Sequence, residues 1–165
     1  MALETAGEIT VDVDRRIAFA FVQDPKRLAG CIPGCRDLRE LAPGRYSAVL
    51  TNRVAFMTLS FTLVIDVVRI EPPTEIEAKI TGDAVGLPGH LVATASVQLT
   101  EAVGCRTTIR YVTDVGLTGK LGGLGQPAFR ATSAQLAREF GANLKKGIEA
   151  GRTETHAEAM TKADE

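Results

Sequence analysis

Residues 59–70 read LSFTLVIDVVRI, and this stretch decides the fold class of the 165-residue chain. From Leu59 to Val67 every second residue carries a large apolar side chain, and polar side chains fill most of the positions between. An alternation with a period of two is typical of a β-strand that buries one face and leaves the other in water. The pair Pro72-Pro73 ends the strand, because proline cannot donate to a sheet ladder.

Six further segments show the same alternation, and turn-forming pairs such as Pro43-Gly44 separate some of them. Strands joined by short turns predict an antiparallel meander with one apolar face. The six segments are 3–13, 38–42, 46–51, 76–80, 91–99 and 109–112.

Helical patterns occur in two places. After the first strand, Asp14 offers an N-cap for a helix over 15–22, and Asp24-Pro25 begins a second that runs to about Cys31. Near the C-terminus, a helix is predicted from Pro127 to about Ala150, about 36 Å long and able to cross a whole sheet. Its inward stripe comprises Phe129, Ser133, Leu136, Phe140, Asn143, Leu144 and Ile148.

The long helix is the one large element able to cover the apolar face of the strands. We therefore predict an α+β fold of order β-α-α-β6-α, in which a seven-stranded antiparallel sheet curls around the C-terminal helix. Residues 1–150 are expected to form a single domain, and residues 151–165 a polar, disordered tail.

Composition excludes several classes of function. A formal net charge of −1 offers no basic face for nucleic acid. No apolar run approaches the ~20 residues of a membrane span, and the N-terminus lacks the pattern of a signal peptide. We therefore expect a cytoplasmic protein without a nucleic-acid partner.

Three cysteines, Cys31, Cys35 and Cys105, form an odd set without a secretory signal, which argues against a disulfide framework. Structural zinc usually takes four nitrogen or sulfur ligands, and the only histidines are His90 and His156. We expect thiols packed around a turn and no metal, with a zinc or redox site as the alternative.

No catalytic constellation is present in the sequence. The glycine pattern Gly123-x-Gly125-x-x-Ala128 fits a dinucleotide fingerprint, but no strand follows the helix to complete the required βαβ unit. His90 is predicted at the start of a strand, so we interpret it as a residue at the rim of the sheet and not as a catalytic base. The acidic residues fall on predicted outer faces or loops, so paired-carboxylate chemistry is the weaker interpretation.

The inward face of the sheet contains unusually small side chains at Ala48, Ala78, Ala93 and Ala95. Proteins rarely keep large voids unless a ligand fills them, so we expect a cavity that holds a hydrophobic small molecule. The alternative is tight helix-sheet contact at the alanines. The expected cavity lining is Ala48, Leu50, Phe61, Leu63, Ile65, Ala78, Leu91, Ala93, Ala95, Val97, Tyr111, Phe129, Ser133, Leu136 and Phe140.

A glycine-rich loop precedes the long helix and could act as a gate to such a cavity. Glycine lowers the steric barriers to movement, and the leucines and the lysine of the loop could meet a bilayer surface. An ordinary connector is the alternative. The gate residues are Gly119, Lys120, Leu121, Gly122, Gly123 and Leu124.

Residues 28–35, LAGCIPGC, closely resemble the signature of the CoxG family of carbon monoxide dehydrogenase subunits, within the START-like SRPBCC superfamily that includes polyketide cyclases and birch-pollen-allergen-like proteins. Gly44-Arg45-Tyr46, the loop 119–125, Glu139-Phe140 and Asn143-Leu144 also match. The resemblance covers about residues 3–150 and implies the helix-grip fold with a cavity between sheet and helix.

The resemblance further implies a bacterial, non-enzymatic carrier of menaquinone, ubiquinone or another lipid, without a tightly bound cofactor. Such a carrier would serve as an accessory subunit of a carbon monoxide dehydrogenase-type molybdenum hydroxylase. Many members have a C-terminal extension that could bind membrane, whereas this chain stops at Glu165. We therefore expect transient contact at the inner face of the cytoplasmic membrane. The alternatives are a cyclase or hydrolase of the same superfamily, and an assembly factor that does not use its cavity.

Overall fold

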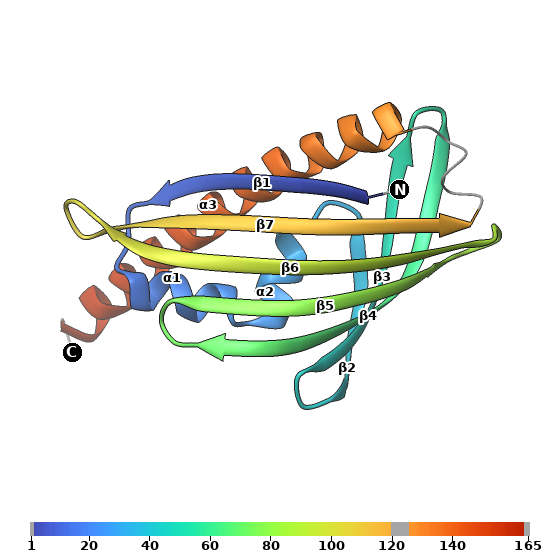
Figure 1. Cartoon of the computed structure of the whole chain (residues 1–165). Coiled ribbons are helices and arrows are strands. Elements are labelled where there is room, and N and C mark those ends of the chain that lie inside the picture. Colours follow the sequence, from blue (N-terminus) through green and yellow to red (C-terminus); the bar gives the residue numbers. More distant parts are fainter. Residues whose placement is uncertain (1, 120–125, 164–165) are drawn as a thin grey trace.

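A curved sheet of seven antiparallel strands and a long helix that lies along it form the structure, a computed structural model (Figure 1). The backbone is described for residues 2–119 and 126–163, and the side chains for these residues except 126 and 151–163. The elements are β1 (Ala2–Val11), α1 (Arg15–Val22), α2 (Pro25–Cys31), β2 (Cys35–Ala42), β3 (Arg45–Val54), β4 (Met57–Glu71), β5 (Glu75–Ala84), β6 (Gly89–Ala102), β7 (Arg106–Gly119) and α3 (Gln126–Ala163).

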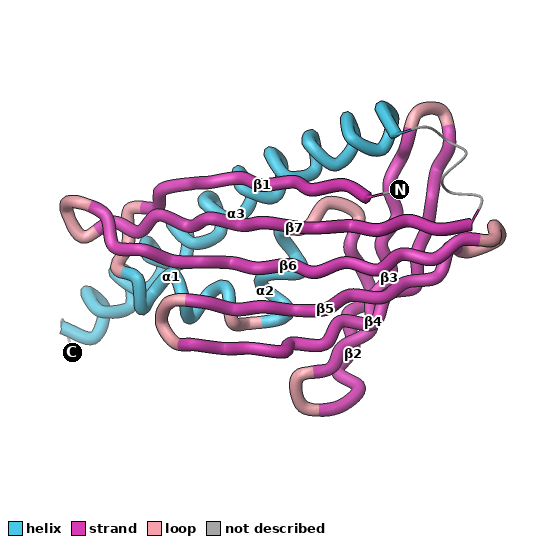
Figure 2. The backbone as a smooth tube through the Cα atoms, viewed as in Figure 1, coloured by secondary structure: helices cyan, strands magenta, loops and turns pink. Residues whose placement is uncertain are grey.

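The strand order across the sheet is β1-β7-β6-β5-β4-β3-β2. The strands β2 to β7 follow one another as a meander, and the first strand of the chain, β1, pairs with the last one, β7. Figure 2 shows the helices on one side of this sheet, with α1 near one end of it and α2 farther along toward the middle. The predicted α+β architecture, with the sheet curled around the C-terminal helix, is confirmed.

The two short helices begin where the sequence predicts. The carboxylate of Asp14 accepts a hydrogen bond from the backbone N–H of Arg16 at 2.7 Å. Asp24 does the same for the N–H of Lys26 at 3.0 Å. Each carboxylate therefore satisfies a backbone donor that has no partner within its own helix.

The end of α3 differs from the prediction. The helix was expected to stop at about Ala150, but its backbone continues to Ala163, so residues 151–163 are helical where we expected a disordered tail. Residues 152–163 contain neither proline nor glycine and include several alanines and glutamates, which favour helix. Within the described part of the chain, no helix carries an apolar stretch long enough to cross a membrane.

Buried apolar side chains form two separate clusters. The helical-end cluster lies where α1 and α2 meet the sheet and α3. It contains Val11, Val13, Ala18, Phe19, Val22, Cys31, Ile76, Val97, Leu99, Ile109, Tyr111, Leu144 and Ile148. The hairpin-end cluster lies toward the β3–β4 turn and the start of α3. It contains Leu3, Val54, Leu59, Phe61, Leu63, Leu91, Ala93, Leu117 and Phe129.

Helix α3 is anchored on the β1–β7 side of the sheet. The Tyr111 hydroxyl on β7 donates a hydrogen bond to the Ala137 carbonyl at 2.9 Å. The Tyr111 ring also meets Phe140 edge to face, with ring centroids 5.0 Å apart. Because the helix is fixed to this side, its other flank faces β3 across a gap.

Candidate ligand-binding site

The concave face of the sheet is incompletely covered between the two clusters. Ala95 lies on the same face of β6 as Ala93 and Val97, which are both buried, yet Ala95 itself is partly exposed. Its neighbour on β5, Ala78, is also partly exposed. Small side chains in the middle of the sheet therefore leave apolar surface within reach of solvent.

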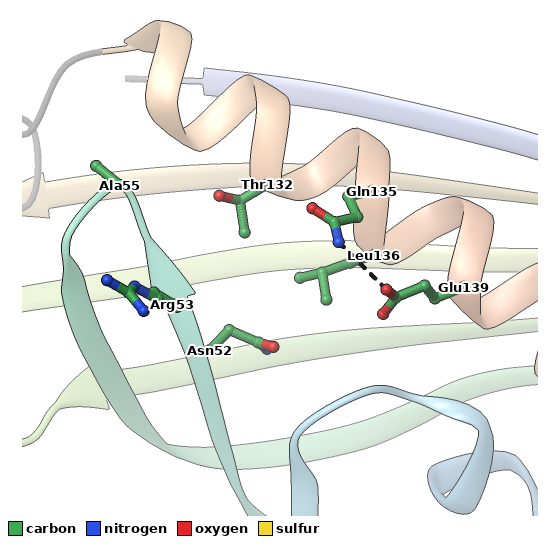
Figure 3. Close-up of a pocket in the computed structure, with 7 residues that line it drawn as sticks. All are labelled: Asn52, Arg53, Ala55, Thr132, Gln135, Leu136 and Glu139. Atoms are coloured by element: carbon green, nitrogen blue, oxygen red, sulfur yellow. Dashed lines mark hydrogen bonds between the residues drawn. The ribbon is translucent and has the colours of Figure 1, made fainter.

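A pocket of about 420 Å³ opens between β3 and α3 (Figure 3). The helix contributes residues 132, 135, 136 and 139, which lie on one helical face because of their spacing. β3 contributes Asn52 and Arg53, near its C-terminal end, and Ala55 in the β3–β4 turn closes one end of the pocket. The lining residues are Asn52, Arg53, Ala55, Thr132, Gln135, Leu136 and Glu139.

The turn between α2 and β2 positions Asn52 at this pocket. The Asn52 side-chain amide donates a hydrogen bond to the Pro33 carbonyl at 3.2 Å, and the backbone N–H of Thr51 donates to the Gly34 carbonyl at 3.0 Å. Gly34 has a φ of 81°, and a Cβ there would overlap the Thr51 carbonyl oxygen. Only glycine fits this approach without a shift of the backbone.

The same turn is connected to α3. The side-chain amide of Asn143 donates a hydrogen bond to the Cys31 carbonyl at 3.1 Å. The Cys-Ile-Pro-Gly-Cys segment therefore links β3 and α3, the two elements that form the pocket walls. Its glycine and its carbonyl groups serve a structural purpose in this arrangement.

Charges of both signs lie at the pocket. Among the described residues, the Arg53 guanidinium has no carboxylate within ion-pair distance. On the opposite wall, the Gln135 side-chain N–H donates to a Glu139 carboxylate oxygen at 3.3 Å. Figure 3 shows Leu136 between these polar groups, with its side chain pointing into the gap.

Apart from Ala48, the predicted cavity residues fall into three groups. Phe61, Leu63, Leu91, Ala93 and Phe129 are buried in the hairpin-end cluster, and Leu50 packs against this cluster from a partly exposed position. Ala48 is buried beside Leu63, its partner on β4, but belongs to neither cluster. Val97 and Tyr111 are buried in the helical-end cluster, and Phe140 packs against it. Ile65, Ala78, Ala95, Ser133 and Leu136 are partly exposed and belong to neither cluster.

Of the predicted residues that the structure describes, Leu136 alone lines the pocket between β3 and α3. The polar residues of the lining were not predicted from the sequence. Asn52 could have been found, because it continues the inward alternation of Ala48 and Leu50 along β3. No such signal exists for Arg53 or Ala55, whose places depend on the β3–β4 turn, where Ala55 has a φ of 56°.

Only one residue of the predicted gate lies in the described part of the chain. Gly119 ends β7 with a φ of 77°, and a Cβ there would lie 2.9 Å from the Gly89 Cα. Lys120, Leu121, Gly122, Gly123 and Leu124 lie outside the described residues.

The cysteines are separate and unpaired with one another. Cys31 is buried and Cys35 is half-buried, and burial raises the pKa of both thiols. The described residues contain no group of three or more histidine, cysteine, aspartate or glutamate side chains placed to hold a metal ion.

His90 has a partner that was not predicted from the sequence. Its Nδ1 lies 2.9 Å from an Asp83 carboxylate oxygen across the β5–β6 ladder. Both side chains are exposed, and the next residue along β6, Leu91, is buried on the concave face. The His90–Asp83 pair therefore lies on the convex face, away from the pocket.

Comparison with solved structures identifies the fold. A conserved protein from Geobacillus kaustophilus is 25% identical with a TM-score of 0.79, over 90% of this chain and 96% of that one. A START superfamily protein from Mycobacterium smegmatis is 10% identical with a TM-score of 0.68, over 89% and 97% of the two chains. The Zhui aromatase/cyclase from Streptomyces sp. R1128 is 14% identical with a TM-score of 0.67, over 90% and 94%.

The fold is therefore the helix-grip fold of START-like proteins. No curated protein sequence gives a significant match. The family model of CoxG, a carbon monoxide dehydrogenase subunit, matches residues 7–149, which include the Cys31–Cys35 turn, both walls of the pocket and most of the sheet. The chain belongs to the CoxG family of carbon monoxide dehydrogenase subunits.

Proposed function

We propose that this protein binds and carries a hydrophobic molecule, and that the molecule is a quinone or another lipid. The observation that supports this most is the partly exposed apolar surface around Ala78 and Ala95, between two clusters that are themselves well packed. Covering apolar surface is favourable by about 25 cal/mol per Å². A ligand that replaces the missing side chains would therefore bind through contacts that the protein alone does not make.

The proposal extends to the partner and the location. The family is described as a subunit of carbon monoxide dehydrogenase. We therefore propose an accessory subunit of a carbon monoxide dehydrogenase-type molybdenum hydroxylase in a bacterium. Its ligand would be menaquinone, ubiquinone or another lipid, collected by transient contact with the inner face of the cytoplasmic membrane.

An enzyme of the same superfamily is the second candidate, favoured by the likeness of the fold to an aromatase/cyclase. The His90–Asp83 pair is the most obvious acid–base pair among the described residues, but it lies on the convex face. The titratable residues at the pocket, Arg53 and Glu139, come from opposite walls and are exposed. We therefore assign no acid–base role to these two residues.

Organic extraction of the purified protein followed by mass spectrometry tests the carrier proposal. We expect one class of lipid to be recovered in a constant ratio to protein, and we expect decylubiquinone to displace a fluorescent apolar probe from extracted protein. Absence of both copurified lipid and probe binding would contradict the carrier and favour the assembly factor. Turnover of an added substrate by the protein alone would favour the enzyme.

A further inference from the structure

We infer that the pocket between β3 and α3 is a headgroup subsite for a neutral, oxygen-bearing headgroup, a carbonyl or a hydroxyl, of the carried molecule. The inference rests on the proposed function and narrows the class of ligand. It starts from the contrast between the pocket, which is lined mainly by polar residues, and the apolar surface deeper along the concave face.

Leu136 connects the two regions. It lines the pocket, and it also belongs to the helix stripe that includes Ser133 and Phe140. Because Leu136 is partly exposed and lies in neither core cluster, its side chain is open to contact with a ligand. The apolar part of an amphiphile would then lie toward Ala95, and its head would lie beside Gln135.

The pocket offers both donors and acceptors of hydrogen bonds. Thr132 contributes a hydroxyl group, which can donate and accept. Gln135 uses one N–H on Glu139 and keeps a second N–H and its carbonyl. A volume of about 420 Å³ lies within the usual range of small-molecule sites and suits a head in preference to a whole long-chain lipid.

Charge distinguishes a neutral head from an anionic one. Arg53 on the strand would attract a carboxylate, but Glu139 on the facing helix would repel it, so the two charges oppose each other. A charged head would also lose hydration on entering the pocket, whereas a neutral oxygen exchanges water for the groups on Thr132 and Gln135. The neutral head is therefore favoured.

Two ligands with the same chain length distinguish a neutral headgroup from an anionic one. These are 1-decanol and decanoate, each titrated at pH 8 against a fluorescent apolar probe. We expect 1-decanol to bind at least about fivefold more tightly, the ratio that one hydrogen bond of ordinary strength provides. Gln135→Leu should weaken 1-decanol binding by a similar factor. Gln98→Leu, at an exposed position on the outward face of β6, is the matched control.

Glu139→Gln gives the sharper test, because it removes the charge while the new amide oxygen can still accept the hydrogen bond from Gln135. Decanoate binding should strengthen several-fold, and 1-decanol binding should stay the same. Glu40→Gln, at an exposed position on β2, is the control for loss of a carboxylate.

The outcomes separate this inference from the proposed function. Decanoate that binds as tightly as 1-decanol, or binding that ignores both pocket substitutions, would overturn the headgroup subsite and leave the carrier standing. Failure of the probe and of both ligands to bind the parent protein would overturn the two together.

Discussion

The Tyr111 hydroxyl occupies the space that a side chain on Gly141 would need. A Cβ on Gly141 would overlap the Tyr111 oxygen, and a Cβ on Gly7 of β1 would overlap the same ring. The two glycines therefore form a slot in which Tyr111 reaches α3. This slot explains why α3 lies close to β1 and leaves its other flank open toward β3.

Gly141→Ala is expected to lower the free energy of unfolding by about 1–3 kcal/mol, the usual range for overpacking, although alanine is the better helix former. Gly30→Ala in α2 is the control, because nothing lies within 4 Å of its Cβ. It should leave stability unchanged or raise it by up to about 1 kcal/mol. Urea denaturation measures both.

A double variant tests the cause. Tyr111→Phe removes the hydroxyl. The atoms then nearest to a Cβ at position 141 would be Ile9 Cγ2 and the Cζ of the ring at position 111, both at 3.2 Å. The cost of Gly141→Ala should then be about 1 kcal/mol smaller than in the parent protein. Strictly additive costs would show that the hydroxyl is not the obstacle.

Gly34→Ala is expected to destabilise the protein by more than Gly86→Ala. Both glycines have positive φ, 81° and 74°, so both variants bear the cost of a left-handed alanine, about 1–2 kcal/mol. Only at Gly34 does the new Cβ also meet backbone, the Thr51 carbonyl oxygen. Equal losses in urea denaturation would contradict the proposed role of the turn in holding β3.

The strands and short helices could be predicted because local chemistry determines them. Asp14 and Asp24 cap the helices in which they were expected to act. The alternation in β4 holds from Leu59 to Leu63, but the register shifts between Val67 and Arg69, and Val68 and Ile70 are exposed. An irregularity of this kind depends on the partner strand, which a single strand's sequence does not reveal.

The site could be predicted only in part. Inward alternation identified Ala78 and Ala95, because their faces follow from strand periodicity. Apart from Asn52, the polar lining of the pocket could not be predicted in this way, because the pocket exists only where α3 leans toward β1. That lean depends on the contact between Tyr111 and Gly141, which lie far apart in the sequence.

Ala95→Phe is expected to block binding of the apolar probe with a loss of stability below about 1 kcal/mol, since overpacking of a full core costs about 1–3 kcal/mol. Val92→Phe, on the exposed face of the same strand, is the matched control and should leave probe binding unchanged. Strong destabilisation by Ala95→Phe, in a parent protein that binds no probe, would show that the space is already filled.

The thiols are expected to differ in reactivity with iodoacetamide. Burial raises the pKa of Cys31 and Cys35 above the ordinary value of 9.0, so at pH 8 less of each is thiolate, the reactive form. Cys105 is exposed and should be alkylated first. Because the thiolate fraction of a thiol rises with pH until its pKa is reached, the alkylation rate of Cys31 and Cys35 should still be increasing at pH values where that of a thiol with an ordinary pKa has levelled off. Peptide mass spectrometry follows each site, and equal rates at pH 8 would contradict the burial.

Phe56 lies at the β3–β4 turn, beside the pocket. Phe56 is 83% exposed, and its neighbours Ala55 and Arg53 both line the pocket. Aromatic side chains favour the boundary between lipid and water, and arginine is attracted to anionic lipid heads. If the ligand is collected from a bilayer, the turn is therefore placed to touch the bilayer next to the opening.

Phe56→Ser should slow the transfer of a fluorescent quinone analogue from anionic liposomes several-fold, with no change in its equilibrium affinity, because Phe56 does not line the pocket. Val103→Ser is the matched control. Val103 is 87% exposed but lies in the β6–β7 turn, at the opposite end of the sheet from the β3–β4 turn (Figure 1). Stopped-flow fluorescence measures both rates. A bilayer contact at the β3–β4 turn involves only one end of the molecule, so equal slowing by the two variants would indicate a general effect of surface hydrophobicity. Unchanged rates in both variants would show that the ligand enters without help from Phe56.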